Sequence, residues 1–564
     1  MTRYRTHFWI LAALVFLFYA NILPNAFVWD DNIFILQNHF IREWRNIPRL
    51  FQSDFFSLSP RRGAFDEKEG GYYRPLVMLC YTVEYHLWGF NPFFYHLVSL
   101  LLHLLNVFLV YRLFHRLFQS EKIAIIGSFL FASCPLHTEA VSYLPSRGDL
   151  LATLFCLLSL HLALAPEKFK KGLSPFFFVM GLLSKESAMV FPLLFVAYGV
   201  LVEKRKKDWA PTAGIFFAIL FLYGFLRFFF FPFRVQSTVA HAPGLFLRVL
   251  SLGQLILSYL ILWIVPYPLH LEKRAPFVRG IGDIGGFLFL LAALGIVWII
   301  HSLWKKNRPL LFGVVWFLIS FLPISNLLLI YPSMADHYLY FPSIGLDAVG
   351  SYFLYRFFVT RRKRDQELFL CLGIFVITLY GLLVIRRNQD YSDEITLFRQ
   401  TLRYAPYSAT THNNLGAVYI SKGFREEAKK EFEQSLSLNS DQPKVWANLG
   451  TVYRESREYD RAIEYLKKAI ARKPDEAIFW NKLGIAYAEQ GSGETERVFQ
   501  TAIEKDPFYG DAYMNLGSWY WKKGEFKKAH SVWREGTLKD PEHGPLKTWF
   551  FLSEAKLFPK EEKP

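Results

Sequence analysis

A succession of long apolar runs fills the first 390 residues, and it limits the folds that the chain can adopt. A helix needs about 20 mostly apolar residues to cross a bilayer. Runs that approach or exceed this length lie at residues 7–23, 93–111, 149–165, 209–231, 246–265, 285–303, 310–328, 341–358 and 368–385. Three shorter runs, at 123–134, 172–183 and 187–202, are separated by short polar insertions that predict tight helical hairpins. The sequence therefore predicts a polytopic helical membrane domain.

Composition agrees with this interpretation. The chain is 52% hydrophobic and 18% aromatic, which excludes a disordered chain and argues against an ordinary soluble enzyme. Arg3 and Arg5 precede the first apolar run and no small-residue cleavage site follows it, so an uncleaved anchor is expected. The four cysteines (Cys80, Cys134, Cys156 and Cys371) form no CxxC motif, and neither a disulfide nor a cysteine-ligated metal is expected.

The net charge of +16 belongs to the hydrophobic half. Residues 1–390 carry 37 of the 64 Lys and Arg residues but only 22 of the 48 Asp and Glu residues. A basic loop beside a membrane helix orients that helix, so this excess does not indicate nucleic-acid binding. The basic clusters are Arg3/Arg5, Arg112/Arg116/Lys122, Lys168/Lys170/Lys171, Lys204–Lys207, Lys305/Lys306/Arg308 and Arg361–Arg364.

The positive-inside rule places all these clusters on the cytoplasmic side. Three apolar runs separate Lys207 from Lys305, an odd number, so one of them, 246–265, is expected to be re-entrant or interfacial. This gives about eleven crossings with the N-terminus inside and the C-terminal domain outside. The outward segments are then 24–92, 135–148, Ser184–Ser187, part of 232–284, and 329–340.

After Asp390 a repeat of 33 to 34 residues begins. Gly416, Gly450, Gly484 and Gly517 recur at this spacing, and a tyrosine follows each glycine by three residues. The tetratricopeptide pattern W-x2-L-G-x2-Y is complete from Trp446 to Tyr453 and from Trp480 to Tyr487. Repeat three is one residue short near Gly491 and has Glu496 where alanine is expected, so a distorted hairpin is predicted there.

The predicted fold class is therefore all-α, with a membrane domain followed by a tetratricopeptide superhelix. The expected divisions are a transmembrane domain at 1–390 with outer loops 24–92 and 135–148, a connecting helix at 391–408, four tetratricopeptide repeats at 409–542, and a C-terminal cap or tail at 543–564. The concave face of such repeats usually binds an extended polypeptide.

Two carboxylates, Asp30 and Asp31, begin the first outer loop. A carboxylate at the membrane surface can accept a proton from an acceptor hydroxyl or hold a divalent ion. The structural alternative is that Asp30 caps the next helix and Asp31 is solvated.

The second outer loop concentrates His137, Glu139, Arg147 and Asp149 between two apolar runs, where each charge is costly unless it is paired or useful. Arg147 can bind a phosphate through two donors, and His137 and Glu139 can orient an acceptor or assist proton movement. The structural alternative is an ion pair of Arg147 with Glu139 or Asp149 that only folds the loop.

Three further segments carry candidate residues. Lys185 and Glu186 interrupt two apolar runs near membrane depth, where a functional role or mutual pairing is expected. Asp336 and His337 begin a polar, aromatic segment whose tyrosines are equally well explained as interfacial anchors. Arg74 ends the first loop and can bind phosphate or pair with Asp30 or Asp31. Arg234, Arg386 and Arg387 are interpreted as headgroup contacts.

The order of these motifs resembles the transmembrane and tetratricopeptide-repeat (TMTC) family, which belongs to the GT-C membrane glycosyltransferases. The resemblance rests on the Asp-Asp loop, YRPL at 73–76, PLHTEAV at 135–141 followed by SRGD, SKES at 184–187, DHYLYFPS at 336–343, and the C-terminal repeats. Two positions depart from the family pattern. Cys134 stands where the family has the first His of HPxH, and Asp336-His337 stands where it commonly has Glu-Arg.

The resemblance implies transfer of a sugar, mannose in the characterised eukaryotic members, from a polyprenyl-phosphate carrier to a Ser or Thr hydroxyl of a protein. It implies that Asp30 or Asp31 is the general base, and that Arg74, Arg147, Lys185 and His337 stabilise the carrier phosphate. His137, Glu139, Asp149, Glu186 and Asp336 would support them. The anomeric centre would be inverted, the lipid tail would lie between membrane helices, and the repeats would hold the acceptor polypeptide.

Other classes stay open. The chain could be a transporter or a non-catalytic membrane-anchored scaffold, or a GT-C transferase that acts on a glycan or lipid. The absence of a Walker loop, GxGxxG, HExxH or a nucleophile elbow from the sequence leaves soluble nucleotide chemistry unsupported. No cofactor is firmly expected, and a divalent metal is left open. The expected location is a bacterial inner membrane with the repeats in the periplasm, or the endoplasmic reticulum membrane in a eukaryote.

Overall fold

The structure is a computed structural model that describes residues 2–52, 72–203, 206–230, 243–274, 276–280, 282–327, 334–359, 363–541 and 543–557. Some expectations from the sequence lie outside these residues: part of the outer segments 24–92, 232–284 and 329–340, Arg234, the basic residues Lys204, Arg205, Arg361 and Arg362, and the C-terminal end of 543–564. The chain divides into two units, Met1–Gln400 and Thr401–Pro564, which are described separately.

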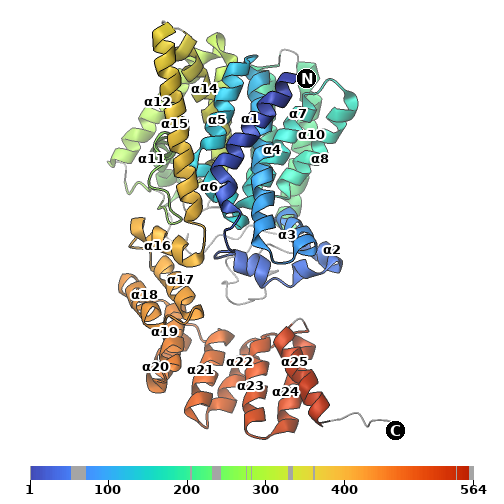
Figure 1. Cartoon of the computed structure of the whole chain (residues 1–564), viewed down its shortest axis with the longest axis vertical. Helices are drawn as coiled ribbons and strands as arrows, with labels where there is room; N and C mark the ends of the chain where they lie inside the picture. Colours follow the sequence, from blue (N-terminus) through green and yellow to red (C-terminus); the bar gives the residue numbers. More distant parts are fainter. Residues whose placement is uncertain are drawn as a thin grey trace. The chain divides into compact units, whose positions relative to one another are not determined.

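Helices make up the regular structure of both units, as the sequence predicts. Within the described residues no strand occurs, and one isolated bridge joins Lys273 to Met334. The longer helices of the first unit (Figure 1) are α1 (Thr2–Tyr19), α3 (Pro75–Trp88), α4 (Pro92–Phe118), α5 (Glu121–Ser133), α7 (Arg147–Ala163), α8 (Lys168–Leu182), α9 (Phe191–Leu201), α10 (Lys206–Phe230), α11 (Leu245–Ile264), α12 (Ile284–Lys306), α13 (Arg308–Phe321), α14 (Ser343–Val359), α15 (Lys363–Gln389) and α16 (Glu394–Tyr404).

Fewer helices than expected pass a test of length and apolar composition for crossing a membrane. The described residues hold seven such helices, or eight if α5 and the bent segment Pro135–Ser142 that follows it form one span. The prediction of about eleven crossings is therefore not confirmed. Segments such as Glu186–Leu201 and Arg308–Ile324 form apolar helices that are too short for the test.

The segment 246–265, expected to be re-entrant or interfacial, falls on α11 (Leu245–Ile264), which is 20 residues long and passes the test for a span. A bent pair of helices lies at Glu121–Ser133 and Pro135–Ser142, with an angle of 50°. The bend arises at Cys134-Pro135, because a proline disfavours helical geometry in the residue before it. The distribution of basic residues between the apolar runs does not report such a bend.

Local sequence explains where the helices of the α4–α5 hairpin begin. The Asn91 side chain accepts a hydrogen bond from the N–H of Phe93, and Pro92 occupies the first turn of α4. Gln119 takes the left-handed conformation that ends α4, and the Ser120 hydroxyl then caps α5 by accepting from the N–H of Ile123. The reversal therefore needs only two residues.

Glycine sets the closest approach between helices α13 and α14. A Cβ on Gly345 would lie 2.4 Å from the carbonyl oxygen of Gly313, and a Cβ on Gly313 would lie 3.1 Å from that of Gly345. The two backbones are thus in direct contact. A larger side chain at Gly345 would force the helices apart.

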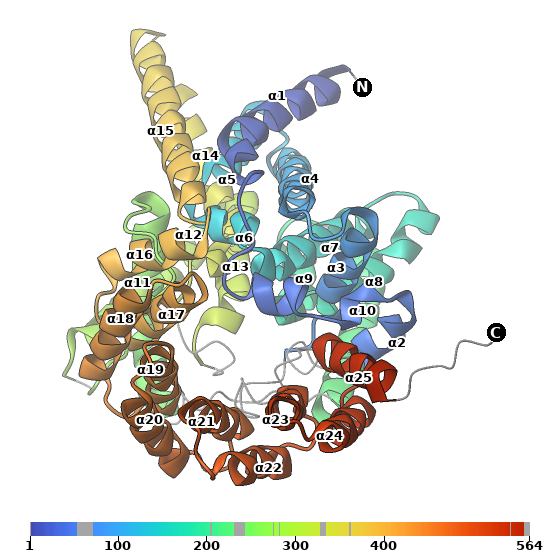
Figure 2. The same cartoon turned by 60° about the horizontal axis from the view of Figure 1, so that its bottom comes forward.

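The second unit consists of four helix pairs and a last helix, arranged in a curved row (Figures 1 and 2). The pairs are α17 (Ala409–Ser421) with α18 (Arg425–Leu438), α19 (Pro443–Glu455) with α20 (Tyr459–Arg472), α21 (Ala477–Gln490) with α22 (Thr495–Lys505), and α23 (Gly510–Lys522) with α24 (Phe526–Lys539). Helix α25 (Gly544–Leu557) follows them.

The repeated glycine keeps the two helices of each pair close together. A Cβ on Gly416, Gly450, Gly484 or Gly517 would lie within 2.8 Å of a side chain of the partner helix, which is Phe432, Leu466, Phe499 or Trp533 respectively. The shortened third repeat keeps this packing by a shift of register. Buried Thr495 takes the place expected for Glu496, whose carboxylate instead accepts a hydrogen bond from Tyr520.

Candidate active site

Charged side chains from separate segments of the first unit form a group of ion pairs, in which the Arg74–Glu186 pair adjoins the others because Glu186 follows Lys185 in the chain. We call this group the ionic cluster; it consists of Arg74, Glu139, Asp149, Lys185, Glu186, Lys273, Asp336, His337 and Arg387. Seven of these residues are candidates from the sequence. Charges in the interior of a membrane protein are costly, so their concentration here marks a candidate site.

Lys185 and Asp149 form the centre of the ionic cluster. Lys185 Nζ lies 2.7 Å from Asp149 Oδ2, and both side chains are at most 6% exposed. Asp149 occupies the first turn of α7, where the helix dipole favours a negative charge. The chain of Lys185 passes close to this turn, since a Cβ on Gly148 would lie 3.1 Å from the carbonyl oxygen of Ser184.

Arg74 and Glu186 close one end of the cluster. Two guanidinium nitrogens of Arg74, Nε and Nη2, donate to Glu186 Oε2 at 3.2 and 3.1 Å. The guanidinium lies over the ring of Tyr72, 4.7 Å from its centre. Arg74 is followed by Pro75 at the start of α3, and this proline fixes where the helix begins.

Glu139 holds the segment that contains Asp336 and His337. Its Oε2 accepts hydrogen bonds from the backbone N–H groups of Asp336 and His337, at 3.0 and 3.2 Å. Its Oε1 lies 2.8 Å from His337 Nδ1, and His337 Nε2 lies 4.0 Å from Asp149 Oδ2. His337 therefore joins Glu139 to the Lys185–Asp149 pair.

Two basic residues that the sequence did not single out as functional complete the cluster. Lys273 pairs with Asp336 Oδ1, and Arg387 Nη2 lies 3.8 Å from Asp336 Oδ2. Arg387 also pairs with Asp390 at 2.9 Å and is only 4% exposed. The interpretation of Arg387 as a headgroup contact is therefore wrong. Lys273 carries no motif, and the bridge to Met334 holds its segment beside that of Asp336.

The two carboxylates of the first loop occupy different environments. Asp30 is half-buried, and its Oδ2 accepts a hydrogen bond of 2.6 Å from the hydroxyl of Tyr143. Asp31 is fully buried; its Oδ2 accepts from the N–H of Val28 at 2.8 Å, and its Oδ1 has no hydrogen-bond partner within the described residues. Burial raises the pKa of Asp31 well above its usual range. The expectation of a solvated Asp31 is wrong.

The backbone between them is held in an uncommon conformation. Trp29 has a φ of 51°, in the left-handed region that larger residues rarely adopt. Its ring stacks on Tyr143 at 5.7 Å, and its N–H donates to Glu394 Oε1 at 3.1 Å. Asn32 donates to the same oxygen at 2.7 Å. These contacts determine where Asp30 lies.

Tyr143 holds Asp30 through its hydroxyl, which donates to Asp30 Oδ2. Burial, first of all, and the charges of Asp30, Asp31 and Glu139 raise the pKa of Tyr143 well above its usual range. The hydroxyl is thus a hydrogen-bond donor to a half-buried carboxylate.

Arg147 is enclosed in a separate buried pair. It is 0% exposed and donates to Glu84 at 2.6 Å, to the carbonyl oxygen of Tyr95 at 2.7 Å and to Ser99 at 3.2 Å. Its guanidinium lies 5.0 Å from the centre of the Tyr81 ring. An ion pair was one of the two expectations for Arg147, but its partner is Glu84, on α3, and neither Glu139 nor Asp149.

His137 is likewise occupied by structural contacts. Its Nδ1 lies 2.8 Å from the carbonyl oxygen of Phe131 and its Nε2 lies 2.9 Å from Ser343 Oγ, with no exposed surface. His137 therefore links the end of α5 to the start of α14 and does not contact the ionic cluster through a ring nitrogen.

No metal site is evident in the described part of the chain, where no three His, Cys, Asp or Glu side chains are grouped so that they could hold an ion.

Two parts of the chain match known protein families. Residues 74–227 match the family described as dolichyl-phosphate-mannose-protein mannosyltransferase, and residues 407–475 match the tetratricopeptide repeat. The first match includes Arg74, Glu139, Asp149, Lys185 and Glu186.

Curated relatives match over most of this chain. Protein O-mannosyl-transferase TMTC3 of Homo sapiens is 26% identical over 77% of this chain and 51% of its own length. A protein O-mannosyl-transferase of Caenorhabditis elegans is 24% identical over 76% of this chain and 62% of its own length. The chain thus spans from about half to three-fifths of the length of these relatives.

Among solved structures, the similarity lies with tetratricopeptide proteins. YrrB, described as a TPR protein with an unusual peptide-binding site, is 25% identical over 27% of this chain and 80% of its own, with a TM-score of 0.23. The crystal structure of MamA is 24% identical over 26% of this chain and 85% of its own, also with a TM-score of 0.23.

Proposed function

We propose that this chain, a distant relative of the TMTC-like protein O-mannosyl-transferases, transfers mannose from a polyprenyl-phosphate carrier to a Ser or Thr hydroxyl of a protein. The observation that carries the proposal is the ionic cluster. It combines the basic residues Arg74, Lys185, Lys273 and Arg387. The match to a mannosyltransferase family, over residues 74–227, includes the first two of them. The scaffold alternative gives no reason for so many charges at one place in a membrane domain.

The chemistry needs a base for the acceptor and cations for the leaving group. The acceptor oxygen attacks C1 of the mannose and gives its proton to a carboxylate. The bond between C1 and the phosphate oxygen breaks, and the carrier leaves as a polyprenyl phosphate with the electron pair of that bond. Direct displacement inverts the anomeric centre. Arg74, Lys185 and His337 stabilise the negative charge that develops on the phosphate, with Lys273 and Arg387 beside them.

We assign the role of base to Asp30 and a structural role to Asp31. Asp30 is the more accessible of the two, and its Oδ2 accepts a hydrogen bond from Tyr143. Asp31 is fully buried and secures the turn through Val28. A buried carboxyl that holds its proton is a poor base for a hydroxyl group that comes from outside.

We assign no donor contact to Arg147 or His137. Every nitrogen of the Arg147 side chain donates to a protein oxygen, and both ring nitrogens of His137 lie within hydrogen-bond distance of one. Their proposed role is to position the helices that carry the site. Four acidic residues hold the basic residues in place and limit the net positive charge of the site. They are Glu139, Asp149, Glu186 and Asp336.

The outer face of the membrane is the proposed side of the reaction, which is the periplasm in a bacterium or the lumen of the endoplasmic reticulum in a eukaryote. Segments assigned to the outside from the sequence supply Glu139, Lys185 and Asp336, and these residues gather in the ionic cluster. The first outer segment also supplies Asp30. The repeats are proposed to hold the acceptor polypeptide, the kind of ligand that tetratricopeptide surfaces usually bind.

The test is transfer of radiolabelled mannose from a polyprenyl-phosphate donor by membranes that contain the full chain. We expect label in protein with the wild type and none above background with Asp30→Asn. Glu43→Gln is the matched control, because Glu43 lies in the same loop, is 39% exposed and pairs with the exposed Arg45. Failure of the folded wild type to transfer any polyprenyl-linked sugar would favour the scaffold.

A further inference from the structure

Residues 388–398 join α15 to α16 and contact the predicted first and second outer loops. We call these residues the junction segment. Asn388, near the end of α15, is fully buried. Its Nδ2 donates to the carbonyl oxygen of Phe18 at 3.0 Å and to Asn21 Oδ1 at 2.8 Å, and its Oδ1 accepts from Ser142 Oγ at 2.9 Å. One amide group thus ties the chain before the first loop to the second loop.

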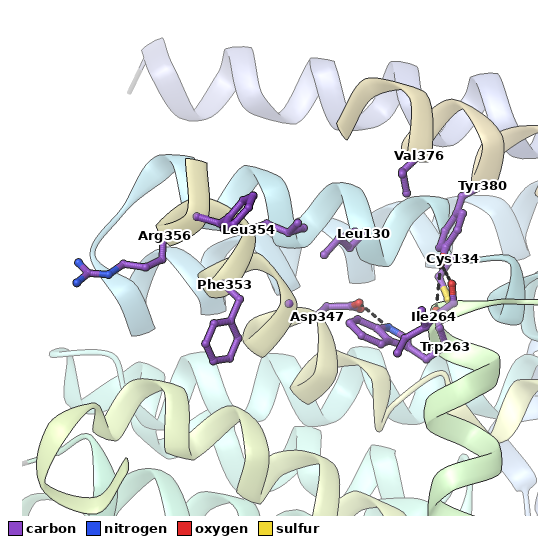
Figure 3. Close-up of a pocket in the computed structure, with 12 residues that line it drawn as sticks. Leu130, Cys134, Trp263, Ile264, Asp347, Phe353, Leu354, Arg356, Val376 and Tyr380 are labelled. Atoms are coloured by element: carbon purple, nitrogen blue, oxygen red, sulfur yellow. Dashed lines mark hydrogen bonds between the residues drawn. The ribbon is translucent and has the colours of Figure 1, made fainter. Parts of the chain in front are cut away.

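The position of Asn388 is set in part by a contact further up α15. The hydroxyl of Tyr380 donates to the carbonyl oxygen of Ile264, at the end of α11, at 2.5 Å. Both residues line a cavity of about 710 Å³ (Figure 3). Eight residues of helix, or about 12 Å, separate Tyr380 from Asn388. Helix α15 is therefore anchored to α11 close to the point where the junction segment begins.

The start of α16 packs against the first loop. The N–H of Ala26 donates to the carbonyl oxygen of Ser392 at 3.0 Å. The ring of Phe398 meets the ring of Trp29 edge-on, with 5.9 Å between their centres. Four buried side chains form one apolar group between the loops and the junction segment: Val28, Tyr143, Tyr391 and Leu397. The junction segment is therefore part of the packed first unit.

Glu394 adds a specific polar contact to this packing. It lies in the first turn of α16, and its Oε1 accepts hydrogen bonds from the N–H of Trp29 at 3.1 Å and from Asn32 Nδ2 at 2.7 Å. Asp30 and Asp31 stand between these two donors in the chain. Trp29 has a φ of 51°, and a large residue keeps such a conformation only where its surroundings impose it. Glu394 therefore helps to impose the shape of the turn that carries Asp30.

The turn at Trp29 controls the carboxylate of Asp30 in two ways. Asp30 follows Trp29 directly, so a change in the backbone of Trp29 redirects the Asp30 side chain. The ring of Trp29 also stacks on Tyr143 at 5.7 Å, and the hydroxyl of Tyr143 donates to Asp30 Oδ2 at 2.6 Å. Loss of the Glu394 contact thus affects both the backbone that presents the carboxylate and the hydroxyl that holds it.

We propose that Glu394 is a positioning residue, which holds Asp30 where its carboxylate can take the proton of the acceptor hydroxyl, so that the start of α16 completes the active site. This inference rests on the proposed function, in which Asp30 is the base. The sequence predicts only a connecting helix for residues 391–408, and the inference gives the beginning of that segment a role in the reaction. Because Glu394 acts through Trp29, its loss should lower kcat and leave KM for the donor unchanged.

Steady-state kinetics of mannose transfer from a polyprenyl-phosphate donor, by the full chain in membranes, test this role. We expect Glu394→Ala to lower kcat about thirtyfold, because misplacement of a reacting group by about 1 Å can cost about a hundredfold in rate, and to leave the donor KM within about twofold. Glu394→Gln keeps an oxygen that accepts hydrogen bonds and should restore kcat to within about threefold of the wild type. Equal loss of kcat in both variants, or a rise of donor KM alone, would overturn the positioning role.

Glu121→Ala is the matched control for a charge at the start of a helix. Glu121 likewise occupies the first turn of its helix, α5, where a carboxylate interacts favourably with the helix dipole. We expect kcat and KM of this variant within about twofold of the wild type. A fall of kcat equal to that of Glu394→Ala would show that loss of any such charge is sufficient, and would contradict the proposal.

Asn32 shows whether Glu394 acts through the first loop. The double variant Asn32→Ala/Glu394→Ala should have the kcat of Glu394→Ala alone, because both substitutions remove the same hydrogen bond. Effects on kcat that multiply would mean that the two residues act independently, against the proposal.

Hydrogen exchange tests the contact without requiring transfer. The N–H of Trp29 loses its acceptor in Glu394→Ala, so the amides of residues 26–34 should exchange at least about tenfold faster than in the wild type. Glu394→Gln should restore the slow exchange. Exchange that Glu394→Ala leaves unchanged would refute the hold on Trp29.

The two proposals fail separately. Wild-type transfer that Glu394→Ala leaves unaffected would refute the positioning role and leave the mannosyltransferase standing. Faster exchange at residues 26–34 in Glu394→Ala, together with no transfer by the folded wild type, would refute the proposed function and, with it, the role of Glu394 in the reaction.

Discussion

Lys185 and Asp149, 36 residues apart in the chain, form a buried ion pair with 2.7 Å between Nζ and Oδ2. Removal of one partner leaves the other charged in a dry environment. We expect Lys185→Met to destabilise the first unit by about 3–5 kcal/mol and to abolish transfer. The double variant Lys185→Met/Asp149→Leu should recover most of the thermal stability in detergent. Recovery of transfer as well would contradict the assignment of Lys185 to the donor phosphate.

Asp31 should make the protein less stable as pH rises. Its pKa is raised in the folded state, so above its usual value near 4 the folded protein holds a proton that the unfolded chain has lost. Stability is then largest at low pH and decreases as pH rises towards the folded pKa. We expect Asp31→Asn, which keeps an acceptor for the N–H of Val28, to flatten this dependence and to retain transfer. Thermal unfolding between pH 5 and 8 measures it.

Arg147 should affect stability and leave donor binding unchanged. Burial raises the pKa of its partner Glu84 to about 7, although Arg147 opposes this shift. Arg147→Met should destabilise the first unit by about 3–5 kcal/mol, because it leaves Glu84 buried without its partner. Arg147→Lys keeps the charge and should leave KM for the donor within about twofold of the wild type. A large rise of KM in a well-folded Arg147→Lys would return Arg147 to the phosphate site.

Arg387 and Arg386 are adjacent residues with different predicted roles. Arg387 is buried and lies 3.8 Å from Asp336, whereas Arg386 is exposed. Arg387→Gln should reduce kcat for mannose transfer by about a hundredfold, because a cation beside the leaving phosphate is lost. Arg386→Gln should have kcat close to the wild-type value. Equal effects of the two substitutions would refute the assignment of Arg387 to the leaving phosphate.

Gly450 offers a way to disturb the repeats alone. A Cβ at this position would lie 2.7 Å from Leu466, so Gly450→Val should destabilise the second unit by about 1–3 kcal/mol. If the repeats present the acceptor, transfer to a protein acceptor falls while transfer to a short Ser/Thr peptide persists. Equal loss with both acceptors would show that the repeats do not present the acceptor.

The sequence predicts helices well and ion-pair partners poorly, and the reason is physical. Apolar length and the 34-residue period are properties of neighbouring residues, so the all-α class and the paired repeats follow from them. The partner of Arg147 is Glu84 because α3 packs there, and this depends on tertiary structure. The same holds for Lys273, which no motif marks.

The first loop illustrates the limit for a catalytic residue. The adjacent acids Asp30 and Asp31 are equivalent in sequence. The left-handed Trp29 and the contacts with Tyr143, Val28 and Glu394 bury one and leave the other accessible. Glu394 therefore helps to decide the environment of Asp30, and the spacing of residues in the sequence does not reveal that contact.

The backbone contact between Gly313 and Gly345 fixes the position of α14 against α13. Helix α14 begins at Ser343, shortly after the segment with Asp336 and His337. Close packing leaves α14 little freedom to slide along α13. The segment that carries Asp336 and His337 is therefore joined to a helix whose position against α13 is set by backbone contact.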